Sequence, residues 1–150
     1  MDTFQAKNLA LSLMDEHGLL NAGWNFKWSK AKYALGTCIH SYKIIKLSIV
    51  YAADTTEENV KDTILHEIAH ALIGSFHGHD NTWKAKCIEI GANPVRSSKS
   101  YNVPQGKYVI TCPVHGILGY YYRRIDETAK RRCKLCSSIV EIKLNENVLV

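Results

Sequence analysis

Residues 55 to 79, TTEENVKDTILHEIAHALIGSFHGH, decide how this chain folds. Hydrophobic residues recur through the stretch with the three- and four-residue spacing of an amphipathic helix. Thr55 and Glu58 have the spacing of a capping box, and Gly74 is a residue type that commonly ends a helix. The pattern therefore predicts a helix that starts at the capping box and ends at Gly74, followed by a loop that contains two histidines.

The segment His66-Glu67-Ile68-Ala69-His70 in this helix matches the motif H-E-x-x-H. Side chains four residues apart lie on one face of a helix, so both histidines can place a ring nitrogen about 2 Å from one zinc ion. Glu67 lies beside that face, where it can act on the attacking water as the general base of a peptidase. The alternative is that the histidines make ordinary hydrogen bonds. A buried apolar helix rarely carries three titratable groups on one turn without a partner, which favours a catalytic zinc.

A catalytic zinc needs a third protein ligand and an open fourth position. The candidates are His77, His79 and Glu89. The long metzincin motif would place its third histidine at Phe76, so that class is excluded. His79 lies in a turn before the next expected helix and is the preferred third ligand. His77 and Glu89 stay open as alternatives, Glu89 because its spacing is used by some glutamate-ligand zinc peptidases.

The segments HEIAHAL (66–72) and GHDNTWKAKCIEIGANP (78–94) resemble the SprT-like zinc metallopeptidases, which are related to the Spartan proteases. In that family the third histidine precedes an aromatic residue by four positions, and here those positions hold His79 and Trp83. Asp80 stands where the family usually has glycine. The resemblance extends over most of the chain. It implies a zincin-like fold, an endopeptidase activity, and substrates that are bound or crosslinked to DNA.

Two further ligand pairs lie in the C-terminal third, Cys112-Pro113-Val114-His115 and Cys133-Lys134-Leu135-Cys136. The 17 residues between the pairs fall within the spacing of zinc ribbons, in which two turns present four tetrahedral ligands. A closed site of four protein ligands has no position for a reacting water, so we expect a structural zinc here. The alternative is a short hairpin with unliganded thiols. Cys38 and Cys87 have no such spacing and are expected to be core residues.

The positive charge of the chain is concentrated in the same region. Its net charge is +5, but residues 1–95 carry nine Lys/Arg and ten Asp/Glu, whereas residues 96–150 carry ten and four. Tyr120, Tyr121 and Tyr122 lie between the ligand pairs together with five cations: Arg123, Arg124, Lys130, Arg131 and Arg132. Aromatic and basic residues together can stack on bases and hold phosphates, so we expect contacts with DNA, especially single-stranded DNA. The alternative is that the tyrosines pack a small core while the cations form a solvated face.

Composition limits the class of protein. Hydrophobic residues make up 46% of the 150 residues, which supports a packed core. No apolar run approaches the roughly 18 residues that span a bilayer, and the N-terminal residues lack the pattern of a signal peptide. We therefore expect a cytoplasmic protein with no membrane partner. In a reducing compartment its five cysteines favour metal binding over disulfides.

The remaining elements predict an α+β fold. Aromatic and β-branched residues predict strands over residues 24–28 and 42–50, with Gly36 in a turn or bulge between them. Further helices are predicted over residues 3–16 and 82–90, each followed by a glycine.

We expect a zincin-like domain over residues 1–96 and a basic zinc-ribbon domain over residues 97–150, with a linker at Arg96–Ser100. The predicted function is a zinc-dependent endopeptidase with one catalytic and one structural zinc, acting on a protein or peptide substrate. One rival is a non-enzymatic module that binds zinc and DNA and keeps the fold; such a module would be marked by loss of Glu67 or of the third ligand. A metal-dependent nuclease is a second rival. It fits worse, because the histidine-rich endoribonuclease pattern lacks a glutamate after its first histidine.

Overall fold

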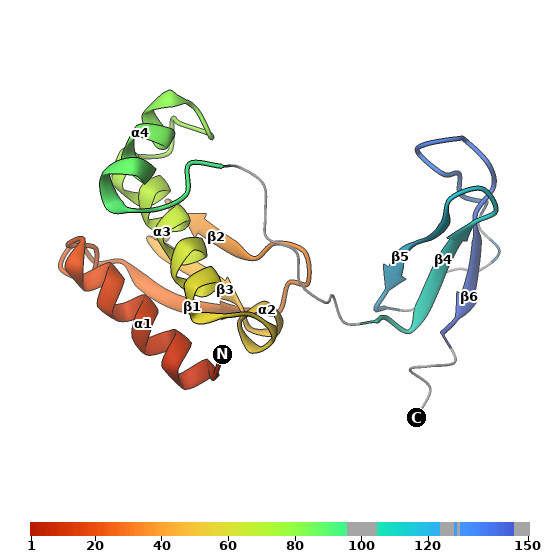
Figure 1. The fold of residues 1–150 in the computed structure, drawn as a ribbon, viewed down its shortest axis with the longest axis horizontal. Coiled ribbons are helices and arrows are strands. Elements are labelled where there is room, and N and C mark those ends of the chain that lie inside the picture. The colour runs from red at the N-terminus through yellow and green to blue at the C-terminus, as the bar shows by residue number, and fades with distance from the viewer. Residues whose placement is uncertain (96–104, 124–127, 129, 146–150) are drawn as a thin grey trace. The chain divides into compact units, whose positions relative to one another are not determined.

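The computed structural model divides into two compact units, unit 1 (residues 1–103) and unit 2 (residues 104–150), shown in Figure 1. It describes residues 1–95, 105–123, 128 and 130–145. The predicted linker and the predicted boundary after residue 96 lie outside the described residues. In the part of the chain that is described, no helix is both long and apolar enough to cross a membrane.

Unit 1 has a mixed α+β fold, as the sequence predicts, with a small sheet. Its elements in chain order are α1 (Thr3–Glu16), β1 (Asn25–Ser29), β2 (Gly36–Ile39), β3 (Ile44–Ser48), α2 (Ile49–Asp54), α3 (Glu57–Ile73) and α4 (Asn81–Ile90). The predicted helices over 3–16 and 82–90 are confirmed as α1 and α4. Gly91, in the left-handed conformation, ends α4, as its position in the sequence suggests.

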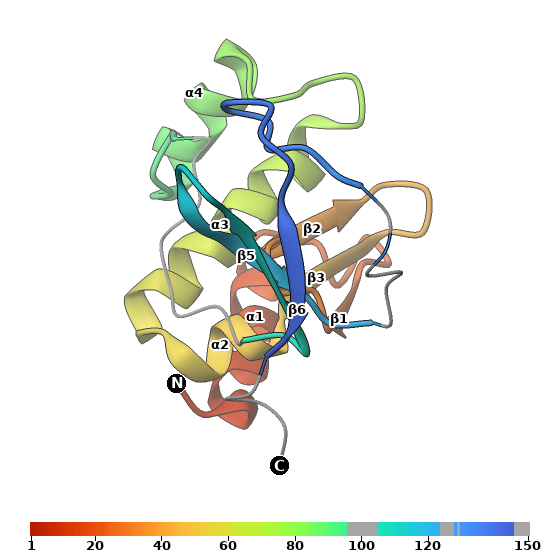
Figure 2. The same cartoon turned by 90° about the vertical axis from the view of Figure 1, so that its right-hand side faces the viewer.

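The sheet of unit 1 has the strand order β1-β3-β2. The central strand β3 pairs in parallel with β1 and antiparallel with β2, which therefore forms one edge. Ile45 and Leu47 of β3 are fully buried, whereas Lys46 points to the opposite, less buried face. Figure 1 and Figure 2 show α1 and α3 on the same side of this sheet. One face of the sheet is thus covered by helices.

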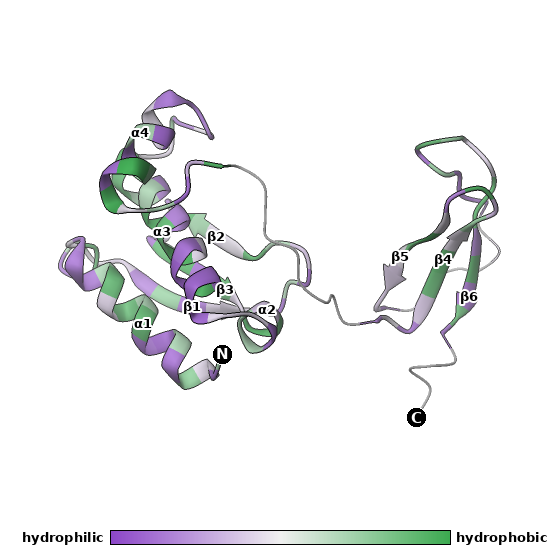
Figure 3. Ribbon diagram, viewed as in Figure 1, coloured by the Kyte–Doolittle hydropathy of each residue, from purple (hydrophilic) through white to green (hydrophobic). Residues whose placement is uncertain are grey.

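The core lies between these helices and the sheet. Helix α1 buries Ala6, Ala10, Leu13 and Met14, which recur with helical spacing along one face. Helix α3 is hydrophilic over its first turns (Figure 3), and its buried residues lie between Val60 and Ala69. Each fully buried aliphatic side chain contributes about 1.5–3 kcal/mol to folding. The core therefore holds α3, the helix that carries the H-E-x-x-H segment, in a fixed position.

Two predicted boundaries in unit 1 are wrong by a short distance. The N-cap of α3 is Thr56 rather than Thr55, because the Thr56 hydroxyl accepts a hydrogen bond from the backbone N–H of Asn59 at 3.3 Å. The strand predicted over residues 42–50 ends at Ser48, which caps helix α2 by accepting from the backbone N–H of Tyr51. Local side-chain bonds to the backbone set both boundaries.

The expectation for Gly36 is also wrong. It is the first residue of β2 and pairs with Leu47 of β3 instead of forming a turn. Gly36 matters because the side chain of Glu67 lies against it in space.

Unit 2 is a three-stranded antiparallel sheet with the order β5-β4-β6. The strands are β4 (Tyr108–Cys112), β5 (Gly116–Tyr121) and β6 (Glu141–Leu144). Among its described residues, the buried hydrophobic side chains are Tyr108, Cys112, Cys133 and Ile142. Two of these four are cysteines of the predicted ligand pairs, so the core of unit 2 is small and partly made of possible metal ligands.

Candidate metal centres

Three histidine side chains converge beside α3. His66 and His70 lie one turn apart on α3, and His79 comes from the loop before α4. Nε2 of His79 lies 3.0 Å from Nε2 of His66 and 3.2 Å from Nε2 of His70. One donor atom from each of the three residues lies within 4.8 Å of the others, and all three residues are half-buried. The structure thus brings together the three residues that the sequence favours as ligands of one ion.

The arrangement of these nitrogens suits a shared cation. A ring nitrogen has one position in the ring plane, which either carries a proton or accepts one hydrogen bond. Nε2 of His79 therefore cannot bond to both of its neighbours at once. Nitrogens that bind one ion at about 2 Å lie at similar separations, and three imidazoles are a common donor set for zinc. The group therefore fits a zinc ion.

Glu67 lies next to this histidine group without belonging to it. Its Oε1 atom is 4.0 Å from Nε2 of His66, and only 8% of the residue is exposed. A Cβ atom on Gly36 would lie 2.9 Å from both Cγ and Oε1 of Glu67, so any other residue at position 36 would force the Glu67 side chain or β2 to shift. Burial raises the pKa of Glu67 to about 8. The result is a carboxyl group beside the histidines, shielded from bulk water and with an increased proton affinity.

Trp83 packs against all three imidazoles. It is fully buried near the start of α4. Its ring centroid lies 4.6 Å from those of His66 and His79 in edge-to-face contacts, and 5.3 Å from that of His70, at an interplanar angle of 20°. Its indole N–H donates to the backbone carbonyl of His66 at 3.4 Å. These contacts restrict how the imidazoles can turn, so Trp83 preorganises the donor nitrogens.

Asp80 fixes the loop that presents His79. Its Oδ1 atom accepts from the backbone N–H of Trp83 at 3.0 Å and thereby caps α4. Its Oδ2 atom accepts from Nδ1 of His77 at 2.7 Å. The hydrogen bonds from Trp83 and His77 lower the pKa of Asp80. Asp80 therefore ties down the chain on both sides of His79.

The two alternative third ligands make other contacts. His77 donates to Asp80, as described above. Glu89 lies on the exposed side of α4, where its Oε2 atom is 2.8 Å from Nζ of Lys86. Among the described residues, the donors that group beside α3 are His66, His70 and His79.

His40 is a further residue of the site that the sequence analysis missed. It follows β2, and its Nε2 atom donates to the backbone carbonyl of His70 at 2.9 Å. Burial lowers the pKa of His70 to about 4, and His79 and His40 add to the effect. His70 is therefore neutral near pH 7, which leaves its ring nitrogen able to bind a metal. No local signal marks His40, because its contact joins residues 30 positions apart.

The second candidate centre lies in unit 2. Donor atoms of Cys112, His115, Cys133 and Cys136 all lie within 4.8 Å of one another. Sγ of Cys112 is 3.5 Å from Sγ of Cys136 and 3.6 Å from Nδ1 of His115. No other described residue belongs to this group, so its donor set consists of three sulfur atoms and one nitrogen, which suits a tetrahedral zinc.

Two similar turns present these ligands. Backbone N–H groups of Val114 and Leu135 each donate to the sulfur two residues earlier, Cys112 and Cys133, at 3.4 Å. Each turn is followed closely by a residue with a positive φ angle, Gly116 in the first and Ser137 in the second. Hydrogen bonds from Ser138 lower the pKa of Cys136 to about 6, which favours the thiolate that binds metal.

Neither Cys38 nor Cys87 belongs to the donor groups that the described residues form, although Sγ of Cys38 lies 3.9 Å from Nε2 of His40. Cys87 is fully buried and Cys38 is half-buried against the core of unit 1, in line with the expectation that they are core residues. Burial raises the pKa of Cys38 to about 12 and that of Cys87 to about 11, so both are poor thiolates.

Four of the five predicted nucleic-acid contacts are among the described residues: Arg123, Lys130, Arg131 and Arg132. All four are exposed, whereas Arg124 lies outside the described residues. The guanidinium of Arg131 lies 5.3 Å from the ring centroid of Tyr121 and donates to its hydroxyl at 3.0 Å. Tyr121 is half-buried, so it contributes to the packing of unit 2 and also supports a cation at the surface.

Comparison with protein families gives a match that covers almost all of unit 1. The model of the SprT-like family matches residues 6–105, which include all three histidines of the first centre and Glu67. This match confirms the resemblance noted in the sequence. Neither the curated proteins nor the solved structures contain a match to the chain.

Proposed function

The chain belongs to the SprT-like family, and on this premise we propose that unit 1 is a zinc-dependent endopeptidase with a zincin-like fold. His66, His70 and His79 hold the catalytic zinc, and Glu67 is the general base. One observation carries the proposal: three Nε2 atoms converge beside a buried carboxylate that is not itself one of the donors. A hydrolytic site needs such a base outside the coordination sphere, whereas a structural site does not.

The side chains of the site divide the chemistry between them. Zinc, when bound, supplies a Lewis acid that polarises the scissile carbonyl and acidifies water. Glu67 accepts the proton of the attacking water and then donates it to the nitrogen of the leaving amine. Trp83 and Asp80 hold the imidazoles and the His79 loop, so that the donors do not have to be ordered during each turnover.

For unit 2 the proposal is a zinc ribbon with a structural zinc. Cys112, His115, Cys133 and Cys136 provide four protein donors, and no carboxylate belongs to the group that the described residues form. A site closed by four protein ligands leaves no position for a substrate. Its contribution is to hold the strands and turns of unit 2 together.

The proposed role of unit 2 is to recruit the peptidase to proteins bound or crosslinked to DNA. A groove of about 400 Å³ on this unit combines Leu118 and Tyr121 with the cations Arg131, Arg132 and Lys134. Apolar and aromatic surface suits an unpaired base, and the cations suit its phosphates, which favours single-stranded DNA. The excess of six positive charges in residues 96–150 supports the same partner.

The peptidase proposal is tested by a zinc count together with cleavage of casein or histones, with and without single-stranded DNA. We expect about two zinc ions per chain and activity that Glu67→Gln reduces by about 10²-fold or more while zinc is retained. Equal activity in the parent and Glu67→Gln would contradict the mechanism. A chain that binds zinc and DNA but cleaves neither protein would instead be the non-enzymatic module.

The DNA proposal is tested by the salt dependence of binding. Arg131→Ala should weaken binding of single-stranded DNA and reduce the slope of log K against log salt by roughly one unit. Lys143→Ala is the matched control, because it removes the same charge from β6, where Lys143 lies 2.9 Å from Glu141. If both variants bind as tightly as the parent at several salt concentrations, the cations of the groove are a solvated face.

A further inference from the structure

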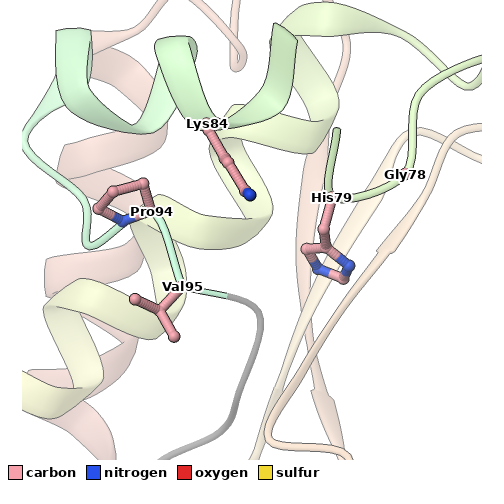
Figure 4. A pocket seen from close by; sticks show the side chains of 5 residues that line it. All are labelled: Gly78, His79, Lys84, Pro94 and Val95. Atoms are coloured by element: carbon pink, nitrogen blue, oxygen red, sulfur yellow. The ribbon is translucent and has the colours of Figure 1, made fainter. Parts of the chain in front are cut away.

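A pocket of about 700 Å³ adjoins the histidine group of unit 1. It is lined by Gly78 and His79 of the loop, by Lys84 of α4, and by Pro94 and Val95 beyond that helix. In Figure 4 the ammonium group of Lys84 lies between His79 on one side and Pro94 and Val95 on the other. The pocket therefore shares a wall, His79, with the proposed zinc site.

Lys84 brings an unneutralised positive charge to this pocket. Among the described residues, no carboxylate lies within ion-pair distance of its ammonium group, whereas Lys86 on the same helix pairs with Glu89 at 2.8 Å. Asp80, one turn earlier, uses its two oxygens on His77 and the Trp83 backbone. The other lining residues are apolar or, in the case of His79, directed at the histidine group.

We propose that this pocket is a substrate subsite that selects a carboxylate, with Lys84 as the residue that determines the specificity; the proposal rests on the peptidase function of unit 1. Pro94 and Val95 provide apolar surface for methylene groups, and the ammonium group provides a charge-assisted hydrogen bond. Because His79 is the shared wall, the carboxylate belongs to a residue close to the scissile bond. Its source is either an acidic side chain or the C-terminus of a peptide.

The first test compares cleavage of peptides that are blocked at both ends and differ at one position, occupied by Glu, Gln or Lys. Positions on both sides of the scissile bond are scanned. In the parent we expect kcat/KM for the best-placed Glu to exceed that for Gln by about two- to tenfold. Lys84→Met should reduce this ratio to about one, and Lys84→Glu should invert the preference in favour of Lys.

Lys86→Met is the matched control, since it removes the same charge from the same helix and should leave the ratio unchanged. A second peptide pair, neutral and with a free or an amidated C-terminus, distinguishes the two sources. If Lys84→Met affects only the free-ended peptide, the subsite takes a terminal carboxylate. All variants should keep the zinc content of the parent, which excludes indirect damage through His79.

A binding measurement separates this proposal from the peptidase proposal. In a Glu67→Gln background, fluorescence anisotropy gives Kd for the Glu and Gln peptides without cleavage. We expect Glu peptides to bind about two- to tenfold more tightly, and this difference to disappear with Lys84→Met. If Lys84→Met changes the Kd neither of peptides with an acidic side chain nor of peptides with a free C-terminus, the subsite proposal is overturned. If the parent shows this binding preference but cleaves no peptide, the subsite proposal stands and the peptidase proposal is refuted.

Discussion

The histidine group of unit 1 and the cysteine-histidine group of unit 2 are assembled in opposite ways. His66 and His70 project from a helix whose buried face is part of a large core, and the fully buried Trp83 packs against them. Unit 2 has a small core in which Cys112 and Cys133 are themselves buried members. The comparison indicates that in unit 1 the histidine group is added to a core that is already large, whereas in unit 2 the cysteine-histidine group makes up much of the core itself.

The two centres also differ in what lies beside the donors. A buried carboxyl group, that of Glu67, lies 4.0 Å from Nε2 of His66 in unit 1. In unit 2 the neighbours of the sulfurs are backbone N–H groups and the Ser138 hydroxyl. Three donors leave one position open on a zinc ion, and a base beside that position suits hydrolysis. Four donors close the site, and hydrogen-bond donors around the sulfurs suit stable thiolates.

The strongest test of this contrast is to remove one ligand from unit 2. Cys133→Ser should unfold unit 2, because binding of a structural zinc is worth about 10–16 kcal/mol and few other buried contacts remain. Unit 1 should stay folded. Residue-resolved NMR of the full chain checks both statements, with loss of dispersed signals confined to residues 105–145. A variant whose unit 2 stays folded without metal would show that its core is sufficient by itself.

Removing the third histidine should, in contrast, cost one zinc ion without unfolding either unit. His79→Ala should lower the zinc content from about two ions per chain to about one and abolish cleavage, while both units stay folded. Glu89→Ala is the control, because Glu89 pairs with Lys86 on the exposed side of α4 and should leave both ions bound. Elemental analysis gives the counts. If Glu89→Ala loses an ion and His79→Ala does not, Glu89 is the ligand.

A smaller effect concerns the pH dependence of metal-free unit 1. The pKa of Glu67 is raised to about 8 in the fold, so the folded chain binds more protons there than the unfolded chain between about pH 4.5 and pH 8. The contribution of Glu67 to the free energy of unfolding should therefore fall as pH rises through this range. Glu67→Gln has no ionisable group at this position, so its free energy of unfolding should not fall in this way. Above pH 8 the variant should be more stable than the parent by a few kcal/mol, since each tenfold change in proton affinity is worth about 1.4 kcal/mol.

Urea denaturation of both chains in the presence of a chelator measures this difference as a function of pH. Between about pH 6.5 and pH 4.5, Glu67→Gln should lose stability as pH falls, because the lowered pKa of His70 means that its protonation favours the unfolded chain. In the parent the extra proton on folded Glu67 offsets this loss over the same range. If the free energies of unfolding of parent and variant differ by the same amount at every pH, the Glu67 carboxyl group is not buried as described.

The smallest expected effect is that of Asp80 on zinc binding, through the loop that presents His79. Asp80→Ala removes both the cap of α4 and the bond to His77, and should weaken zinc binding at the histidine group by about 10- to 100-fold, as for other residues that orient ligands. Asp80→Asn, which keeps the cap, should cost less. Competition with a chelator measures both. Asp62→Ala is the control, because Asp62 accepts from the backbone of Asn93, away from the loop.

Most of the secondary structure of unit 1 could be predicted, since hydrophobic spacing and the terminal glycines mark α1, α3 and α4. Apart from Gly36, which lies in β2, the failures were at capping residues. Thr55 and Thr56 are chemically equal candidates for the N-cap of α3, and Ser48 reads as part of a strand until its hydroxyl is seen to bond to the backbone of Tyr51. Competing side chains one position apart cannot be ranked from sequence alone, because the surrounding packing chooses between them.

The sequence by itself determined the first two histidines of unit 1 and the two ligand pairs of unit 2. Histidines four apart on a helix share a face, and each C-x2-H or C-x2-C turn brings its own two ligands together, so local geometry fixes each pair. Only the tertiary structure decided which of His77, His79 and Glu89 lies beside the first pair. It alone placed Gly36 against Glu67 and His40 against His70. These contacts join residues 9 to 31 positions apart, whose separation in space depends on how α3, α4 and β2 pack rather than on any local rule.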